Sequence, residues 1–117
     1  MIKKIYEPVF GVQVIFANGI FEQVKKRFKK YKYDESYAKL AGSVTFLDTE
    51  EKGKKYRDYL IHIEDPKDFY CLLHEVVHLV VHIFTDRGVE YSEHNNELIA
   101  YYQTFWFKKL WRITNKK

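Results

Sequence analysis

The sequence is poor in cysteine, with Cys71 alone among 117 residues. An intramolecular disulfide is therefore excluded, and nothing in the cysteine content indicates an oxidising compartment. Internal repeats, low-complexity segments and linker-like stretches are also missing. We therefore expect one domain spanning residues 1–117.

Long apolar runs are missing as well. Glu7, Pro8 and Gln13 interrupt the apolar residues that follow Lys3 and Lys4, which argues against a signal peptide. No unbroken apolar stretch reaches the roughly 20 residues that a bilayer span needs. We expect a soluble, cytoplasmic protein without a membrane span.

Aromatic and basic residues are abundant instead, with 18% Phe, Trp and Tyr and a formal net charge of +4. The aromatics supply large areas for burial in so short a chain. The basic residues gather in two clusters: Lys25, Lys26, Arg27, Lys29, Lys30 and Lys32, and Lys108, Lys109, Arg112, Lys116 and Lys117. Such clusters can meet a nucleic acid or an acidic partner, but we interpret them as solvated surface and see no strong nucleic-acid signal. A homodimer through Trp106 or Trp111 stays open.

The hydrophobic pattern predicts three strands, at residues 9–16, 42–47 and 56–63, and an amphipathic helix at residues 21–33. Asp65 is expected to cap a helix that begins at Pro66 and ends near Gly88. Ser92 or Asn95 is expected to cap a last helix that runs to about Arg112. The order is β-α-β-β-α-α, a small α+β domain with a three-stranded sheet.

The strand at residues 56–63 carries two further expectations. Its alternation directs Tyr59, Ile61 and Ile63 to one face, so His62 is expected to face solvent. Because the strand leads directly into the next helix, it is also the candidate edge strand for holding an extended substrate.

The helix predicted after Pro66 has apolar residues around almost its whole circumference, which is typical of a buried helix. Yet His74, Glu75, His78 and His82 fall within one stripe about 100° wide. Burying several titratable groups is costly unless they are paired or bind a metal.

Residues 74–78 read H-E-V-V-H. Histidines four residues apart lie one above the other on a helix, so His74 and His78 can both reach one zinc ion. Glu75, offset by about 100°, can reach a metal-bound water and take its proton. The alternative to a metal site is a set of buried histidines whose ring nitrogens are satisfied by hydrogen bonds.

Catalytic zinc usually keeps three protein ligands, and Glu97 near the start of the last helix is the best third candidate. His82 lies one turn too far along a straight helix to share the ion, and is expected either to line the floor of the site or to form a hydrogen bond with Tyr101 or Thr104. Cys71 is interpreted as a small buried residue. His94 is interpreted as an exposed residue or a lining residue of the cleft.

The combined pattern is H-E-x-x-H at residues 74–78 and N-E-x-x-A at residues 96–100, with eighteen residues between His78 and Glu97, and it resembles the gluzincin branch of the zinc metallopeptidases. The chain is also similar to small zincin-like proteins encoded by bacteriophages. The resemblance implies a minimal zincin-like fold, with His74, His78 and Glu97 as zinc ligands and Glu75 as general base. Tyr101 stands where large gluzincins carry an Asp, and its hydroxyl can accept a hydrogen bond from a ligand imidazole.

Three interpretations follow. The first is a zinc-dependent hydrolase, most simply a metallopeptidase acting on a peptide or protein. The second is a catalytically silent zinc-binding protein of the same fold that serves as a binding or assembly module. The third is a nucleic-acid- or protein-binding domain with an accidental H-E-x-x-H.

Overall fold

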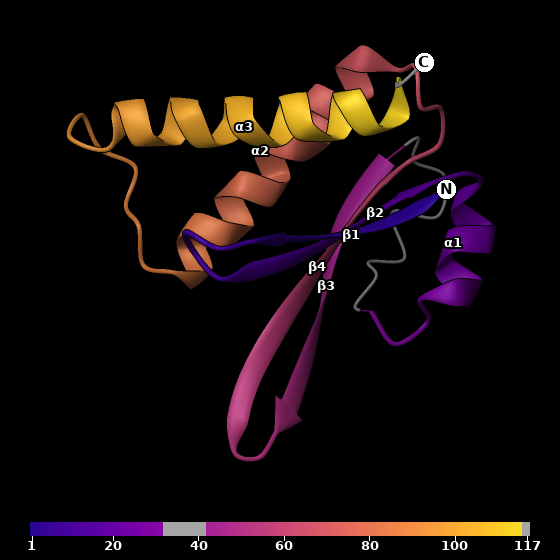
Figure 1. Ribbon diagram of the computed structural model, residues 1–117, viewed down its shortest axis with the longest axis horizontal. Helices are drawn as coiled ribbons and strands as arrows, with labels where there is room; N and C mark the ends of the chain where they lie inside the picture. Colours follow the sequence, from indigo (N-terminus) through magenta and orange to yellow (C-terminus); the bar gives the residue numbers. More distant parts are fainter. Residues whose placement is uncertain (32–41, 116–117) are drawn as a thin grey trace.

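The structure, a computed structural model, describes residues 1–31 and 42–115. Figure 1 shows its elements, in chain order β1 (Ile2–Glu7), β2 (Val12–Asn18), α1 (Phe21–Arg27), β3 (Gly42–Glu51), β4 (Lys54–Ile63), α2 (Phe69–Asp86) and α3 (Asn96–Thr114). The expected α+β class is confirmed. The sheet has four strands rather than the three expected.

The fourth strand is β1, which the sequence pattern did not predict. It pairs antiparallel with β2, with Ile5 opposite Val14. The strand expected at residues 9–16 is confirmed over residues 12–16, which belong to β2, but it begins later than expected. Residues 8–11 form the turn between β1 and β2, where Gly11 takes a positive φ of 63°. Proline has no amide hydrogen for a sheet ladder, and glycine tolerates a positive φ, so both suit a turn.

The strand order is β1-β2-β4-β3, with β2 and β4 parallel and the other pairs antiparallel. The expectation that residues 56–63 form an edge strand is therefore wrong, since β4 lies inside the sheet. Among the described strands, β3 is at the edge beside β4. Hydrophobic residues on both faces of β4 are buried, which is why its alternation did not reveal its position.

Each face of the sheet has its own hydrophobic core. Figure 1 shows α2 and α3 on one face and α1 on the other. Tyr59, Ile61 and Ile63 of β4 pack with α2 and α3, while Leu60 packs on the α1 side with Val24. The expectation that His62 faces solvent is wrong, because the second core covers the face to which it points and leaves it 0% exposed.

The hairpin of β3 and β4 extends beyond the rest of the sheet (Figure 1). Its turn residues, Lys52 and Gly53, both have positive φ, as two-residue hairpin turns require. At its base Arg57 donates hydrogen bonds to Asp48 of β3 and Asp86 of α2. This contact ties the hairpin to the C-terminal end of α2.

Helix α2 begins three residues later than expected. Asp68, not Asp65, is its N-cap, and the Asp68 side chain accepts a hydrogen bond from the Cys71 amide at 2.9 Å. Helix α1 ends at Arg27, and the expected continuation to residue 33 partly falls outside the described residues.

Helix α2 is not buried all round, contrary to the sequence expectation. Leu73, Val77 and Val81, at successive turns, are each about 40% exposed. By length and composition alone α2 is apolar enough to cross a bilayer, although no unbroken apolar stretch was found in the sequence. The core helix of a soluble protein passes the same test, so this property alone is weak evidence for a membrane span.

Candidate metal centre

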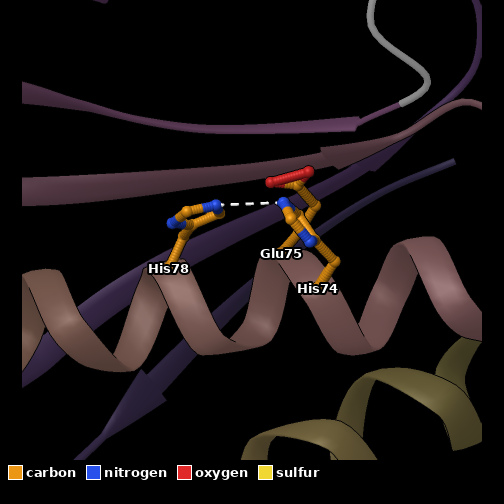
Figure 2. A group of neighbouring side chains, drawn as sticks. All are labelled: His74, Glu75 and His78. Atoms are coloured by element: carbon orange, nitrogen blue, oxygen red, sulfur yellow. Dashed lines mark hydrogen bonds between the residues drawn. The ribbon is translucent and has the colours of Figure 1, made fainter.

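The two histidines of the motif converge on the solvent-facing side of α2. Their Nε2 atoms are 3.1 Å apart, and both side chains are exposed. Figure 2 shows His74, Glu75 and His78 extending from the helix toward the strands. One ligand atom from each of the three lies within 4.8 Å of the others. The spacing of four residues brings the imidazoles together because α2 is a regular helix here.

Glu75 is the buried member of the group, only 6% exposed. Burial raises the pKa of its carboxyl to about 7, and the neighbouring His74 acts in the opposite direction. Burial also lowers the pKa of His78, with His74 and His82 adding to the effect. Near neutral pH His78 is therefore held in the neutral form that binds metal ions.

The first residue of β3 lies directly against Glu75. A Cβ atom at Gly42 would lie 2.9 Å from Glu75 Oε2 and 2.6 Å from Cys71 Sγ, closer than side-chain carbons approach in folded proteins. The backbone of β3 can approach the carboxylate this closely because position 42 is glycine. Glu75 is thus held between α2 and β3.

A hollow of about 80 Å³ lies beside the group, lined by three residues of β3, Gly42, Ser43 and Val44, and four of α2, His74, Glu75, His78 and His82. The sequence predicted the α2 residues but not those of β3. The only signal was a glycine in a predicted strand, which marks a close approach without saying to what.

Two further residues of α2, His82 and Cys71, lie near the group. His82 lines the hollow, as expected, and its ring lies 6.4 Å from that of Phe46. Cys71 is half-buried, and burial together with the nearby Glu75 raises the pKa of its thiol to about 11. The thiol is therefore protonated at neutral pH, the unreactive form.

The structure does not bring Glu97 to this group. Glu97 is exposed in the first turn of α3 and is not a member of the group of ligand atoms. Helix α3 contacts α2 through Phe69 and Phe84, which lie on roughly the opposite side of α2 from the histidines. Figure 2 shows the same arrangement, with α3 on one side of α2 and the three side chains on the other.

Tyr101 lies one turn after Glu97 on α3 and is 71% exposed. Its hydroxyl was expected to support a ligand imidazole, but α3 meets the opposite side of α2. His94 is exposed before the start of α3, as one of its two interpretations expected. Glu97, Tyr101 and His94 therefore lie together near one end of α3, apart from His74 and His78.

The two histidines have a separation that fits a zinc ion. Two nitrogens bound to zinc at about 2.1 Å with a tetrahedral angle lie about 3.4 Å apart. The observed Nε2–Nε2 distance of 3.1 Å is close to that value. Imidazole and carboxylate groups are also the ligand types that zinc and other divalent transition metals bind.

Comparisons of this chain with protein-family models, with curated proteins and with solved structures found no match.

Proposed function

We propose that this chain is a zinc-dependent hydrolase, most simply a metallopeptidase acting on a peptide or protein, with His74 and His78 as metal ligands. One observation carries the proposal: the two Nε2 atoms and a carboxylate oxygen of Glu75 converge within 4.8 Å on one side of α2. Among the described residues no further imidazole or carboxylate joins this group.

A zinc ion at this position would lower the pKa of a bound water to about 7 and polarise a carbonyl oxygen. With such an ion held by His74 and His78, Glu75 would be placed to accept a proton from the attacking water and to return it to the leaving amine. Its packing against Gly42 holds the carboxylate in one position, so its orientation is fixed before substrate binds. Within residues 1–31 and 42–115, no contact supports the roles expected for Glu97 and Tyr101 at this site.

The first test separates metal binding from hydrolysis. Protein purified without a metal-affinity column is analysed for zinc and assayed on denatured casein by mass spectrometry. Replacing His74 or His78 by Gln is expected to weaken zinc binding by more than about tenfold, because loss of a residue that merely hydrogen-bonds to a metal ligand already costs about that much. Glu75→Gln is expected to retain zinc and slow hydrolysis at least about 100-fold, the usual contribution of a general base.

The matched control is His94→Gln, which removes an exposed imidazole outside the group. It is expected to leave zinc content and hydrolysis unchanged. Wild-type protein that binds no zinc contradicts the metal centre. A Glu75→Gln protein that cleaves at the wild-type rate removes Glu75 from the mechanism.

A catalytically silent metal-binding module is the second candidate function. It is favoured by the size of the hollow beside the group, about 80 Å³, which is little more than the space of a few water molecules. Zinc binding by both wild-type and Glu75→Gln protein, without cleavage of any member of a peptide library, supports this function over hydrolysis.

A further inference from the structure

A second surface, which shares no residue with the metal centre, is lined by cations. Lys3 of β1 and Lys109 and Arg112 of α3 surround a hollow of about 790 Å³. The rest of its lining consists of Met1, Trp111, Ile113 and Asn115. No aspartate or glutamate from the described part of the chain lines it, so the hollow combines positive charge with an apolar floor.

A smaller hollow of about 230 Å³ adjoins the first one at Met1, which lines both. Arg27 of α1 is the one charged side chain that the described residues contribute to its lining. Figure 1 shows the N-terminus between α1 and the C-terminal end of α3, so the two hollows follow one another across that end of the molecule. We call the surface of Lys3, Arg27, Lys109 and Arg112 around Met1 the basic face.

The cations of the basic face are available to a ligand. All four side chains are exposed, and none forms an ion pair with another residue in the described part of the chain. Four unpaired cations along one concave surface attract a polyanion and release its counterions on binding.

Trp111 favours one class of polyanion. Its ring lies parallel to that of Phe107, with an interplanar angle of 9° and centroids 6.1 Å apart, and it lines the larger hollow beside Lys109 and Arg112. An aromatic ring beside cations in a concave surface is the arrangement that takes an unpaired base and its phosphates. A bilayer is flat and binds side chains that protrude, whereas these residues line hollows.

We propose that the basic face binds single-stranded nucleic acid, with phosphates on Lys3, Arg27, Lys109 and Arg112 and a base against Trp111. The proposal is independent of the metal centre, because the basic face contains none of its residues. A single strand is favoured over a duplex because a base must be unstacked to reach the ring.

The test measures binding of a fluorescein-labelled oligothymidylate by anisotropy between about 50 and 200 mM salt. Four phosphate contacts predict a slope of about −3 in a plot of log affinity against log salt. The triple variant Lys3→Gln, Lys109→Gln, Arg112→Gln is expected to bind at least about tenfold more weakly, and the slope is expected to flatten to about −0.7, the value for the one remaining contact at Arg27.

The matched control is Lys54→Gln, Lys55→Gln, Lys67→Gln, which removes the same charge from exposed positions elsewhere. It is expected to weaken binding less than about threefold. Equal weakening in the two triple variants means that net charge alone binds the oligonucleotide, and overturns the proposal. So does undetectable binding by the wild-type protein.

Tryptophan fluorescence provides a second readout that needs no charge change. Trp106 is 0% exposed, so quenching by the oligonucleotide reports on Trp111, and Trp111→Phe is expected to abolish it. A duplex that binds as tightly as the single strand overturns the choice of a single strand. Binding to phosphatidylserine vesicles without binding to the oligonucleotide overturns the proposal in favour of a membrane surface.

Discussion

His62 is the buried histidine that the sequence assigned to solvent. Its Nε2–H donates a hydrogen bond to the Gly19 carbonyl at 2.6 Å, while Nδ1 is buried without a hydrogen-bond partner among the described residues. Burial lowers the pKa of His62, and the weaker influences of the Gly19 carbonyl and Glu64 oppose that shift. The neutral ring is therefore the form that the fold accommodates.

This burial gives the free energy of unfolding a defined pH dependence. Because the folded-state pKa lies below the ordinary value of about 6.5, the unfolded chain takes up the proton first and stability falls as pH drops below that value. The loss is at most about 1.4 kcal/mol per pH unit for one proton. Stability stops falling once the pH is below the folded-state pKa, because the histidine is then protonated in both states.

The measurement compares urea unfolding of wild-type and His62→Gln protein between about pH 7.5 and pH 5. Glutamine keeps a donor for the Gly19 carbonyl but does not titrate, and Glu75 titrates in both proteins, so their difference isolates His62. A difference that stays constant across this range contradicts the assignment of a lowered pKa.

At the scale of single residues, the sequence predicted the side chains that share one helix and missed those that approach through space. His74, Glu75 and His78 follow from a spacing that any α-helix converts into proximity. The contact of Gly42 with Glu75 depends on how β3 packs on α2, which no local pattern encodes.

At the scale of elements, the start of α2 is the clearest discrepancy. Asp65 followed by Pro66 is a strong local signal for a helix start. In the structure the Asp65 side chain accepts from the Lys67 amide in a turn, and Asp68 caps the helix. Both aspartates can cap, and packing of Phe69 against α3 accompanies the later start.

The two aspartates therefore predict unequal effects on stability. Asp68→Ala is expected to lower the free energy of unfolding by about 1 kcal/mol, because the Cys71 amide loses its acceptor. Asp65→Ala is expected to cost less, because its acceptor role lies in the preceding turn. Urea denaturation of both variants checks this order, and a larger loss for Asp65→Ala contradicts the assignment of Asp68 as the cap.

Among the strands, too, some were predicted from the sequence and one was missed. The strands expected at residues 42–47 and 56–63 are confirmed, the second from its alternation, although both extend further into the hairpin. The first strand was missed because Lys3 and Lys4 interrupt its pattern, and only Ile5 and Glu7 of β1 are buried. A charged, partly exposed edge strand carries too little alternation to be recognised alone.

At the scale of the whole molecule, the arrangement of α2 and α3 decides which residues can share a site. The sequence correctly predicted two successive helices but placed Glu97 beside His74 and His78. Buried contacts of α3, such as the hydrogen bond from the Tyr102 hydroxyl to Glu7 of β1, hold it over the sheet on the other side of α2. Such long-range contacts were not visible in the spacing of the motif.

Metal removal tests the site through the stability of the whole fold. A metal that binds only the folded chain stabilises it by about 2.7 kcal/mol at about 100 times its dissociation constant. Adding a chelator to zinc-loaded protein is therefore expected to lower the Tm by about 10 °C in calorimetry. The double variant His74→Gln, His78→Gln is the control, and its Tm is expected to stay the same when the chelator is added. An unmoved wild-type Tm contradicts zinc binding by the folded chain.

The absence of a side chain at Gly42 has a consequence for the position of Glu75. Any other residue at position 42 adds a carbon that would lie 2.9 Å from Glu75 Oε2, so either the strand or the carboxylate has to shift to make room for it. The place of one side chain in the H-E-V-V-H segment thus depends on a missing methyl group in a strand outside that segment.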